Sequence, residues 1–168
     1  VDGGHIPSKD PDSRSFEVIT SVVYRPESVK PNKKNTRNTL ESKSCAASAK
    51  EDQQEQIIAD TILAALKEGM TSETNVTAIC DGAANCWNVT EALEPICAKM
   101  TSILDWFHIA MKMENISFPA DLKGKFLRIK WHLWRGNVKY AILRLEQLIE
   151  KSQKLDIIKK LKQFLTYI

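Results

Sequence analysis

Residues 76–82 read Val-Thr-Ala-Ile-Cys-Asp-Gly (VTAICDG), and they decide the fold that this chain is expected to have. The run from Val76 to Cys80 is short and apolar, with turn residues on both sides, which is typical of a strand buried inside a sheet. Asp81 follows the run directly, and a glycine comes next. Because α/β sheets bind ligands at the carboxyl ends of their strands, this stretch predicts a buried strand that ends at a polar site.

The chain before this strand has the pattern of an antiparallel sheet. Residues 16–25 (FEVITSVVYR) are rich in β-branched and aromatic residues and predict a strand. Residues 1–8 predict a hairpin partner for it, joined through a turn cluster at residues 9–13. Residues 26–38 are polar and basic with two prolines and predict a loop, and residues 39–47 predict a third strand.

Helical periodicity dominates the rest of the chain. Helices are predicted at residues 49–68, 83–93 and 107–113. From Leu122 onward the chain is expected to be all helical, with Gly136-Asn137 separating two helices and apolar stripes at residues 138–149 and 155–168. A second apolar run at residues 100–104 predicts another strand. An antiparallel start followed by alternating strands and helices predicts an α/β fold, with a mixed sheet flanked by helices and then an all-helical segment.

Charge is segregated along the 168 residues, although the net charge is only +3. Residues 1–50 carry +3, residues 51–110 carry −8, and residues 111–168 carry +8. An acidic middle beside a basic tail is typical of a cation site next to a polyanion-binding surface. The alternative is solvated helix faces, and charge by itself favours that alternative.

Composition excludes several other classes of protein. No run approaches the roughly 18 consecutive apolar residues of a membrane helix, and no secretory signal is present. The cysteines form no Cys-x-x-Cys pair and have no histidine at zinc-ligand spacing, so they are predicted to be reduced packing residues of an intracellular protein. The four cysteines are Cys45, Cys80, Cys86 and Cys97. The chain opens on Val1 rather than Met, so we expect a further part upstream.

Two aspartates stand at positions suited to metal chemistry. Asp2 lies in the first predicted strand before two glycines, and Asp81 ends the buried strand. Carboxylates on neighbouring strands can share a divalent cation, and Mg²⁺ prefers carboxylate oxygens. The alternative is that each aspartate caps a turn or a helix. Asp105 and His108 form a weaker Asp-x-x-His pair, for which the alternatives are a helix cap and a buried histidine.

Four segments together resemble a known family. They are VDGGHIPSK from residue 1, FEVITSVVYRPES from residue 16, VTAICDGAANCW from residue 76 and ILDWFHIAMKM from residue 103. In this order and spacing they resemble the catalytic region of bacterial insertion-sequence transposases of the DDE type, similar to the Mutator-like and hAT groups. The resemblance implies a partial RNase H-like catalytic core at residues 1–113 and an incomplete helical insertion at residues 114–168.

The resemblance also implies roles for individual residues. Asp2 matches the first catalytic acid and Asp81 the second, and both are expected to ligate metal. Asp105 and His108 match a supporting element near the active site. The third acid of the family lies beyond the helical insertion, so none is assigned here, and Mg²⁺ or Mn²⁺ is expected only in the complete enzyme.

The implied reaction is cleavage and transfer of DNA strands at the ends of a mobile element. Two metal ions held by the acids would activate water or a DNA 3′-hydroxyl and stabilise the leaving oxygen, while the protein positions the DNA. Phosphate contacts are expected from a basic loop and from the basic tail. The candidates are Lys30, Lys33, Lys34 and Arg37 in the loop and Lys123, Lys125, Arg128 and Lys130 in the tail. A solvated, flexible connection is an equal alternative for the loop.

The expected partners are DNA, both element ends and target, and further copies of the chain in a homo-oligomer, with no membrane and a location at the bacterial nucleoid in the cytoplasm. Three alternatives stay open: a non-catalytic DNA-binding or assembly module, a stand-alone RNase H-like nuclease, and a decayed reading frame. The nuclease would need a third carboxylate from within the chain, such as Glu17 or Asp105. Trp106 and Trp131 are predicted to be core residues. Trp87 and Trp134 are either core residues or platforms on which a base stacks.

Overall fold

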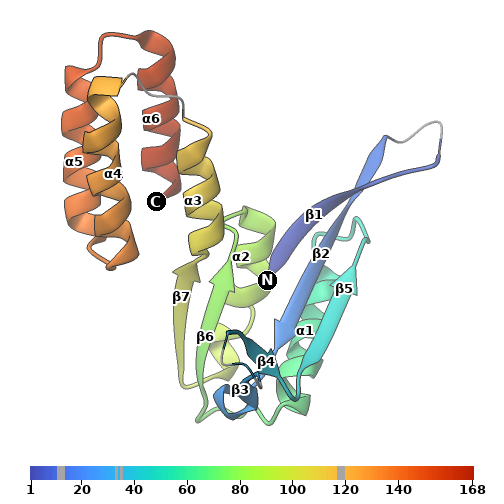
Figure 1. Ribbon diagram of the computed structural model, residues 1–168. Helices are drawn as coiled ribbons and strands as arrows, with labels where there is room; N and C mark the ends of the chain where they lie inside the picture. The colour runs from blue at the N-terminus through green and yellow to red at the C-terminus, as the bar shows by residue number, and fades with distance from the viewer. Residues whose placement is uncertain (11–13, 33, 35, 117–119) are drawn as a thin grey trace. The chain divides into compact units, whose positions relative to one another are not determined.

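The structure is a computed structural model that describes residues 1–10, 14–32, 34, 36–116 and 120–168. The chain divides into two compact parts, unit 1 (Val1–Ile103) and unit 2 (Leu104–Ile168). Unit 1 holds the strands together with two helices, and unit 2 is helical (Figure 1). The chain is therefore mixed α/β, as predicted. The expected division at residue 113 concerns the core of the family that the sequence resembles, and it stays a prediction.

The strands at the start of unit 1 form the predicted antiparallel sheet. β1 (Asp2–Pro7) pairs with β2 (Ser15–Val23), and β2 pairs on its other edge with β5 (Ser44–Ser48). The turn cluster predicted at residues 9–13 lies partly outside the described residues. The region predicted as a single third strand holds two short ones, of which β5 joins this sheet.

The prediction of a loop at residues 26–38 is wrong in part. A short 3₁₀ helix (Pro26–Ser28) leads into β3 (Val29–Pro31), which pairs antiparallel with β4 (Asn38–Leu40). The side chain of Asn32 organises the turn between them, because its Oδ1 accepts hydrogen bonds from the amides of Lys34 and Thr36, both at 3.1 Å. A side chain that replaces backbone partners in this way can order a polar segment that has no strand pattern.

Helix α1 (Glu55–Lys67) packs against β2 and β5. Its buried face includes Ile57 and Thr61, and the Thr61 hydroxyl hydrogen-bonds the buried Ser21 hydroxyl at 2.8 Å. The helix begins later than the predicted residue 49, because Gln53 and Gln54 take left-handed φ values of 54° and 69°. It ends at Lys67, one residue before the predicted end, and Gly69 follows with a φ of 90°.

The second half of unit 1 is a strand–helix–strand unit. β6 (Asn75–Cys80) and β7 (Lys99–Leu104) pair, and they run in the same direction in Figure 1. Helix α2 (Ala84–Glu91) and a 3₁₀ turn (Glu94–Ile96) connect them. One buried cluster joins β2, α1, β6 and α2, so both helices cover the same side of the strands. Its members are Ile19, Ile57, Cys80, Cys86 and Val89.

The other side of these strands is apolar and exposed. Strand side chains alternate, so the face opposite the buried Ile19 carries Phe16 and Val22 of β2. The exposed apolar residues of unit 1's strands include Ile6, Phe16, Val22, Ile79 and Ile103. Within residues 16–24, the aromatic side chains of Phe16 and Tyr24 are exposed together with Val22.

Unit 2 contains α3 (Trp106–Glu114), α4 (Ala120–Trp134), α5 (Val138–Lys151) and α6 (Leu155–Tyr167). The described part of this region is helical, as predicted. A single buried cluster runs through the helices, with Ile129, Leu145 and Leu161 at or near zero exposure. Among the described residues, no helix is long and apolar enough to cross a membrane.

Candidate functional site

Asp2 and Asp81 lie on neighbouring segments of unit 1. The amino end of β1 lies beside the carboxyl end of β6, where the Val1 nitrogen donates a 2.7 Å hydrogen bond to the Ile79 carbonyl (Figure 1). Asp2 directly follows Val1, and Asp81 follows the last residue of β6, Cys80. The backbone at Asp2 and the backbone at Asp81 therefore lie at the same junction of β1 and β6.

Gly3 leaves open space at this junction. A Cβ on Gly3 would lie 3.5 Å from Cys86 Sγ, 3.6 Å from Glu17 Oε1 and 3.8 Å from Asp81 Oδ2. These are ordinary van der Waals distances for a methyl group, so the three side chains lie directly against the Gly3 position. The glycine thus keeps two carboxylates next to a small space.

The carboxylate on the Gly3 side of the sheet is Glu17. Side chains alternate along a strand, so Gly3 and His5 share one face and Asp2 belongs to the other. Glu17 is the register partner of His5 and so shares the face of Gly3, toward which Asp81 Oδ2 lies. Glu17 entered the sequence analysis only as an alternative, because the hairpin register that places it was not known.

Asp81 also shapes its own turn. Its Oδ1 accepts a 2.8 Å hydrogen bond from the amide of Ala83, and Gly82 takes a φ of 91°. This turn leads directly into α2, so the alternative in which Asp81 caps a turn holds for one carboxylate oxygen. The other oxygen, Oδ2, is the one near Gly3.

Asn85 in the first turn of α2 is a site residue that the sequence analysis missed. Its Nδ2 donates a 2.8 Å hydrogen bond to Glu17 Oε1, which ties α2 to β2 across 68 residues of chain. The segment DGAAN gave a signal, since Asn85 lies four residues after Asp81, but its partner on β2 depended on the fold.

Cys86 is a fully buried neighbour of Asp81. Burial, the negative charge of Asp81 and a hydrogen bond to its carboxylate raise the pKa of the Cys86 thiol to about 12. Burial also raises the pKa of Cys80. The raised pKa values disfavour the thiolate form of both residues, which is the form that acts as a nucleophile. All four cysteines are free, but Cys45 is exposed, so the prediction that the cysteines are packing residues is wrong for Cys45.

The donors at this junction form an incomplete metal site. The oxygens of Asp81 and Glu17 are of the kind that Mg²⁺ prefers. However, the described residues contain no group of three or more histidine, cysteine, aspartate or glutamate side chains that could hold a metal ion. These residues therefore do not supply the full ligand set that a divalent cation needs.

Asp105 and His108 lie in unit 2 at the start of α3. Asp105 Oδ1 accepts a 3.0 Å hydrogen bond from the amide of Phe107, so the alternative of a helix cap is confirmed. Asp105 Oδ2 lies 3.7 Å from His108 Nε2, one helical turn away. The Asp-x-x-His pair therefore exists in the structure, but its contacts lie within the first turns of α3.

The predicted phosphate contacts fall on two surfaces. Lys30, Lys34 and Arg37 are exposed on the β3–β4 hairpin, and Lys33 lies outside the described residues. The tail candidates are on α4, where Lys123, Lys125 and Arg128 are exposed.

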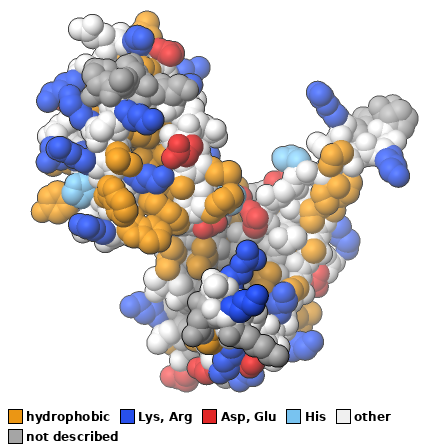
Figure 2. All heavy atoms as spheres, viewed as in Figure 1, with side chains coloured by type: hydrophobic (Ala, Val, Ile, Leu, Met, Phe, Trp, Pro, Cys, Tyr) orange, Lys and Arg blue, Asp and Glu red, His pale blue; other side chains and the backbone are white. Residues whose placement is uncertain are grey.

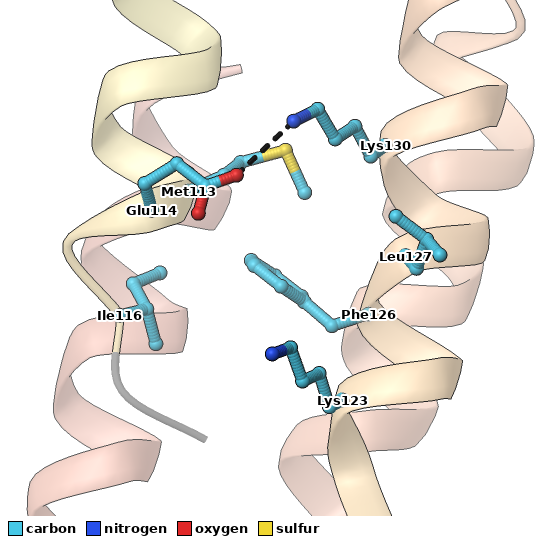
Figure 3. Close-up of a pocket in the computed structure, with 7 residues that line it drawn as sticks. All are labelled: Met113, Glu114, Ile116, Lys123, Phe126, Leu127 and Lys130. Carbon is cyan, nitrogen blue, oxygen red and sulfur yellow. Dashed lines mark hydrogen bonds and ion pairs between the residues drawn. The ribbon is translucent and has the colours of Figure 1, made fainter. Parts of the chain in front are cut away.

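Lys130 differs from the other tail candidates because it is already paired. Its Nζ lies 3.1 Å from Glu114 Oε1 at the rim of a pocket of about 310 Å³ between α3 and α4 (Figure 3). Phe126 and Met113 line the apolar part of this pocket, and Lys123 lies at its edge. The charge of Lys130 is therefore less available to a phosphate than that of Arg128.

The prediction that Trp131 is a core residue is wrong. Its side chain is 54% exposed, because α4 turns Phe126, Ile129 and Leu133 toward the core instead. Trp106 packs against the core of unit 2 as predicted, and its ring meets the 57% exposed Trp134 at 4.9 Å. Trp87 packs against the buried cluster of unit 1, which favours a core role for it.

Comparison of the chain with family models, curated proteins and solved structures finds no match. The functional conclusion accordingly rests on the junction at Gly3 and Asp81 and on the distribution of charge.

Proposed function

We propose that this chain is part of the catalytic region of a DDE-type insertion-sequence transposase, with an RNase H-like core in unit 1 and the start of a helical insertion in unit 2. The observation that carries the proposal is the junction of β1 and β6, where Asp2-Gly3 meets Asp81. The order of elements supports it: antiparallel strands, a helix, and then a strand–helix–strand unit whose first strand lies beside β1.

Asp2 and Asp81 are the proposed catalytic acids, with Asp105 and His108 in support. The third acid is proposed to come from beyond the helical insertion, as the family resemblance implies. The exposed apolar face of the unit 1 strands supports this view, because a large apolar face is normally covered. A further helix packed there would lie on the same face as Asp2.

DNA is the proposed substrate, both as element ends and as target, and a homo-oligomer at the bacterial nucleoid is the proposed assembly. The +8 charge of residues 111–168 and the basic β3–β4 hairpin suit a polyanion. Contacts of this kind position DNA and depend strongly on salt.

The test combines metal and DNA measurements on the 168-residue chain. We expect salt-dependent binding to duplex DNA, weak Mn²⁺ binding by calorimetry that Asp81→Asn abolishes, and no nicking of supercoiled plasmid with Mg²⁺. Asp60→Asn, on α1 of the same unit, is the matched control and should bind Mn²⁺ like the parent chain. Absence of any affinity for DNA would overturn the proposal. DNA binding with no metal binding would favour a non-catalytic DNA-binding module.

A stand-alone RNase H-like nuclease is a second candidate, and the position of Glu17 favours it. Glu17 Oε1 and Asp81 Oδ2 both lie within 4 Å of the open position at Gly3. In this case the chain alone would nick nucleic acid with Mg²⁺, and Glu17→Gln would abolish the activity. Plasmid nicking that survives Glu17→Gln would argue against this candidate.

A further inference from the structure

We propose that the exposed face of α4 binds single-stranded DNA, with a base stacked on Trp131 and phosphates held by Arg128 and Arg135. The proposal rests on the proposed function in taking DNA as the ligand. The preference for unpaired strands follows from the exposed aromatic and cationic side chains of α4.

The first observation is a stretch of chain without carboxylates. No aspartate or glutamate occurs between Asp121 and Glu146. The same stretch carries seven cations: Lys123, Lys125, Arg128, Lys130, Arg135, Lys139 and Arg144. Of these, Lys130 is paired with Glu114. A stretch of chain so one-sided in charge favours a polyanion as its partner.

The second observation is the exposure of large aromatic side chains within that stretch. Trp131 is 54% exposed, and Tyr140 at the start of α5 is 61% exposed. Figure 2 shows hydrophobic side chains gathered together with Lys and Arg side chains over α4 and α5. Exposed aromatic rings within a basic stretch offer faces on which unpaired bases can stack.

The geometry of α4 brings the two kinds of side chain together. Arg128 precedes Trp131 by three residues and Arg135 follows it by four, which are the spacings of neighbours on one helix face. The Arg135 amide hydrogen-bonds the Trp131 carbonyl at 3.3 Å, so the helical turn continues to Arg135. The core residues Ile129 and Leu133 lie on the other side of the helix. Along this exposed stretch, Trp131 therefore lies between Arg128 and Arg135.

The same stretch of chain carries a second pair of aromatic rings. His132, the residue after Trp131, stacks on Tyr140 of α5 with ring centroids 6.0 Å apart and planes 25° apart. This contact restrains the Tyr140 ring before any ligand binds, which reduces the entropy lost on binding. A second base of the same strand has a platform here.

The pairing of aromatic and cationic groups favours a single strand over a duplex. In a duplex the faces of the bases are stacked against one another, so a tryptophan on a helix surface can reach only phosphates and groove edges. Unpaired bases offer their faces to aromatic side chains, and arginines hold the backbone alongside.

The test measures anisotropy of a labelled oligothymidylate of about 20 nucleotides and of a hairpin duplex with the same number of phosphates. EDTA is present throughout, so the result is independent of the metal chemistry of the proposed function. Trp131→Ala should weaken binding of the single strand by roughly tenfold and leave duplex binding unchanged. Trp131→Phe should keep most of the affinity. Leu155→Ala, at a residue 83% exposed on α6, is the control and should bind both ligands like the parent chain.

Arg128→Ala and Arg135→Ala should weaken both ligands, and each should lower the slope of log affinity against log salt by about 0.7 for the single strand. Unchanged oligothymidylate binding by Trp131→Ala would overturn the proposal. The proposal would also be overturned if sedimentation showed a dimer of the parent chain that Trp131→Ala converts to a monomer. The exposed face of α4 would then be a protein interface. If the parent chain binds the single strand but does not bind Mn²⁺, that result would count against the proposed function alone.

Discussion

Gly3 and Asp81 face each other where β1 meets β6, with 3.8 Å between the open Cβ position of Gly3 and Asp81 Oδ2. The residue after Gly3 offers a direct comparison, because a Cβ on Gly4 would meet nothing within 4 Å. The two adjacent glycines therefore differ in what a side chain would touch, and this difference leads to the first prediction.

Gly3→Val should destabilise the chain by about 1–3 kcal/mol, because its γ-carbons would collide with Cys86, Glu17 or Asp81. Gly4→Val is the matched control and should be neutral or stabilising by up to about 1 kcal/mol, since glycine is unfavourable in a strand. Urea unfolding of both variants gives the two free energies. Equal effects would show that the space beside Gly3 has no structural consequence.

The thiol of Cys86 predicts a pH dependence of stability. Its pKa is raised in the folded chain from an ordinary 9.0 to about 12, so folding favours the protonated thiol. The resulting stability is fully present below pH 9 and is lost as the pH rises toward 12. Unfolding free energies across this range should fall more steeply for the parent chain than for Cys86→Ala. Parallel curves for the two proteins would contradict the raised pKa.

The hydrogen bond between Thr61 and Ser21 joins α1 to β2 in a buried place. Thr61→Val removes one hydroxyl and leaves the other without its partner, which should cost about 1–3 kcal/mol of unfolding free energy. Thr77→Val, at an exposed position of β6, should change it by less than about 0.5 kcal/mol. If the two valine variants are equally stable in urea, the buried hydrogen bond contributes nothing measurable.

The basic β3–β4 hairpin should bind DNA phosphates. Lys34→Ala and Arg37→Ala should each weaken duplex binding and lower its salt slope by about 0.9, because one phosphate fewer is neutralised by the protein. Lys160→Ala removes an equal charge from α6, where lysines are expected to be solvated only, and should leave the slope unchanged. Anisotropy titrations at several salt concentrations measure these slopes. If all three variants lower the salt slope equally, the net charge of the chain governs DNA binding and the hairpin is not a specific contact site.

Local pattern accounts for most of the elements. The strands β2, β6 and β7 follow from β-branched or apolar runs between turn residues, and β1 follows as the hairpin partner of β2. The helices follow from the 3.6-residue period. The β3–β4 hairpin escaped prediction because one side chain, Asn32, orders it. Such a contact leaves no periodic signal.

The candidate site divides in the same way. Asp2 and Asp81 could be singled out because each stands beside a glycine in or after a strand, and the basic tail could be counted. Glu17 and Asn85 could not be paired, since 68 residues separate them and only the hairpin register and the packing of α2 bring them to 2.8 Å.

Helix α4 shows most clearly what the sequence determines by itself and what only tertiary packing determines. Its amino acids determine that it is helical, basic and free of carboxylates from Leu122 onward, because these are properties of residues and their spacing. It has two apolar stripes, however: Phe126, Ile129 and Leu133 form one, and Leu127, Trp131 and Trp134 form the other. Packing against the neighbouring helices buries the first and leaves the second exposed. Which stripe becomes core depends on contacts distant in the chain, and those are made only when the whole bundle assembles.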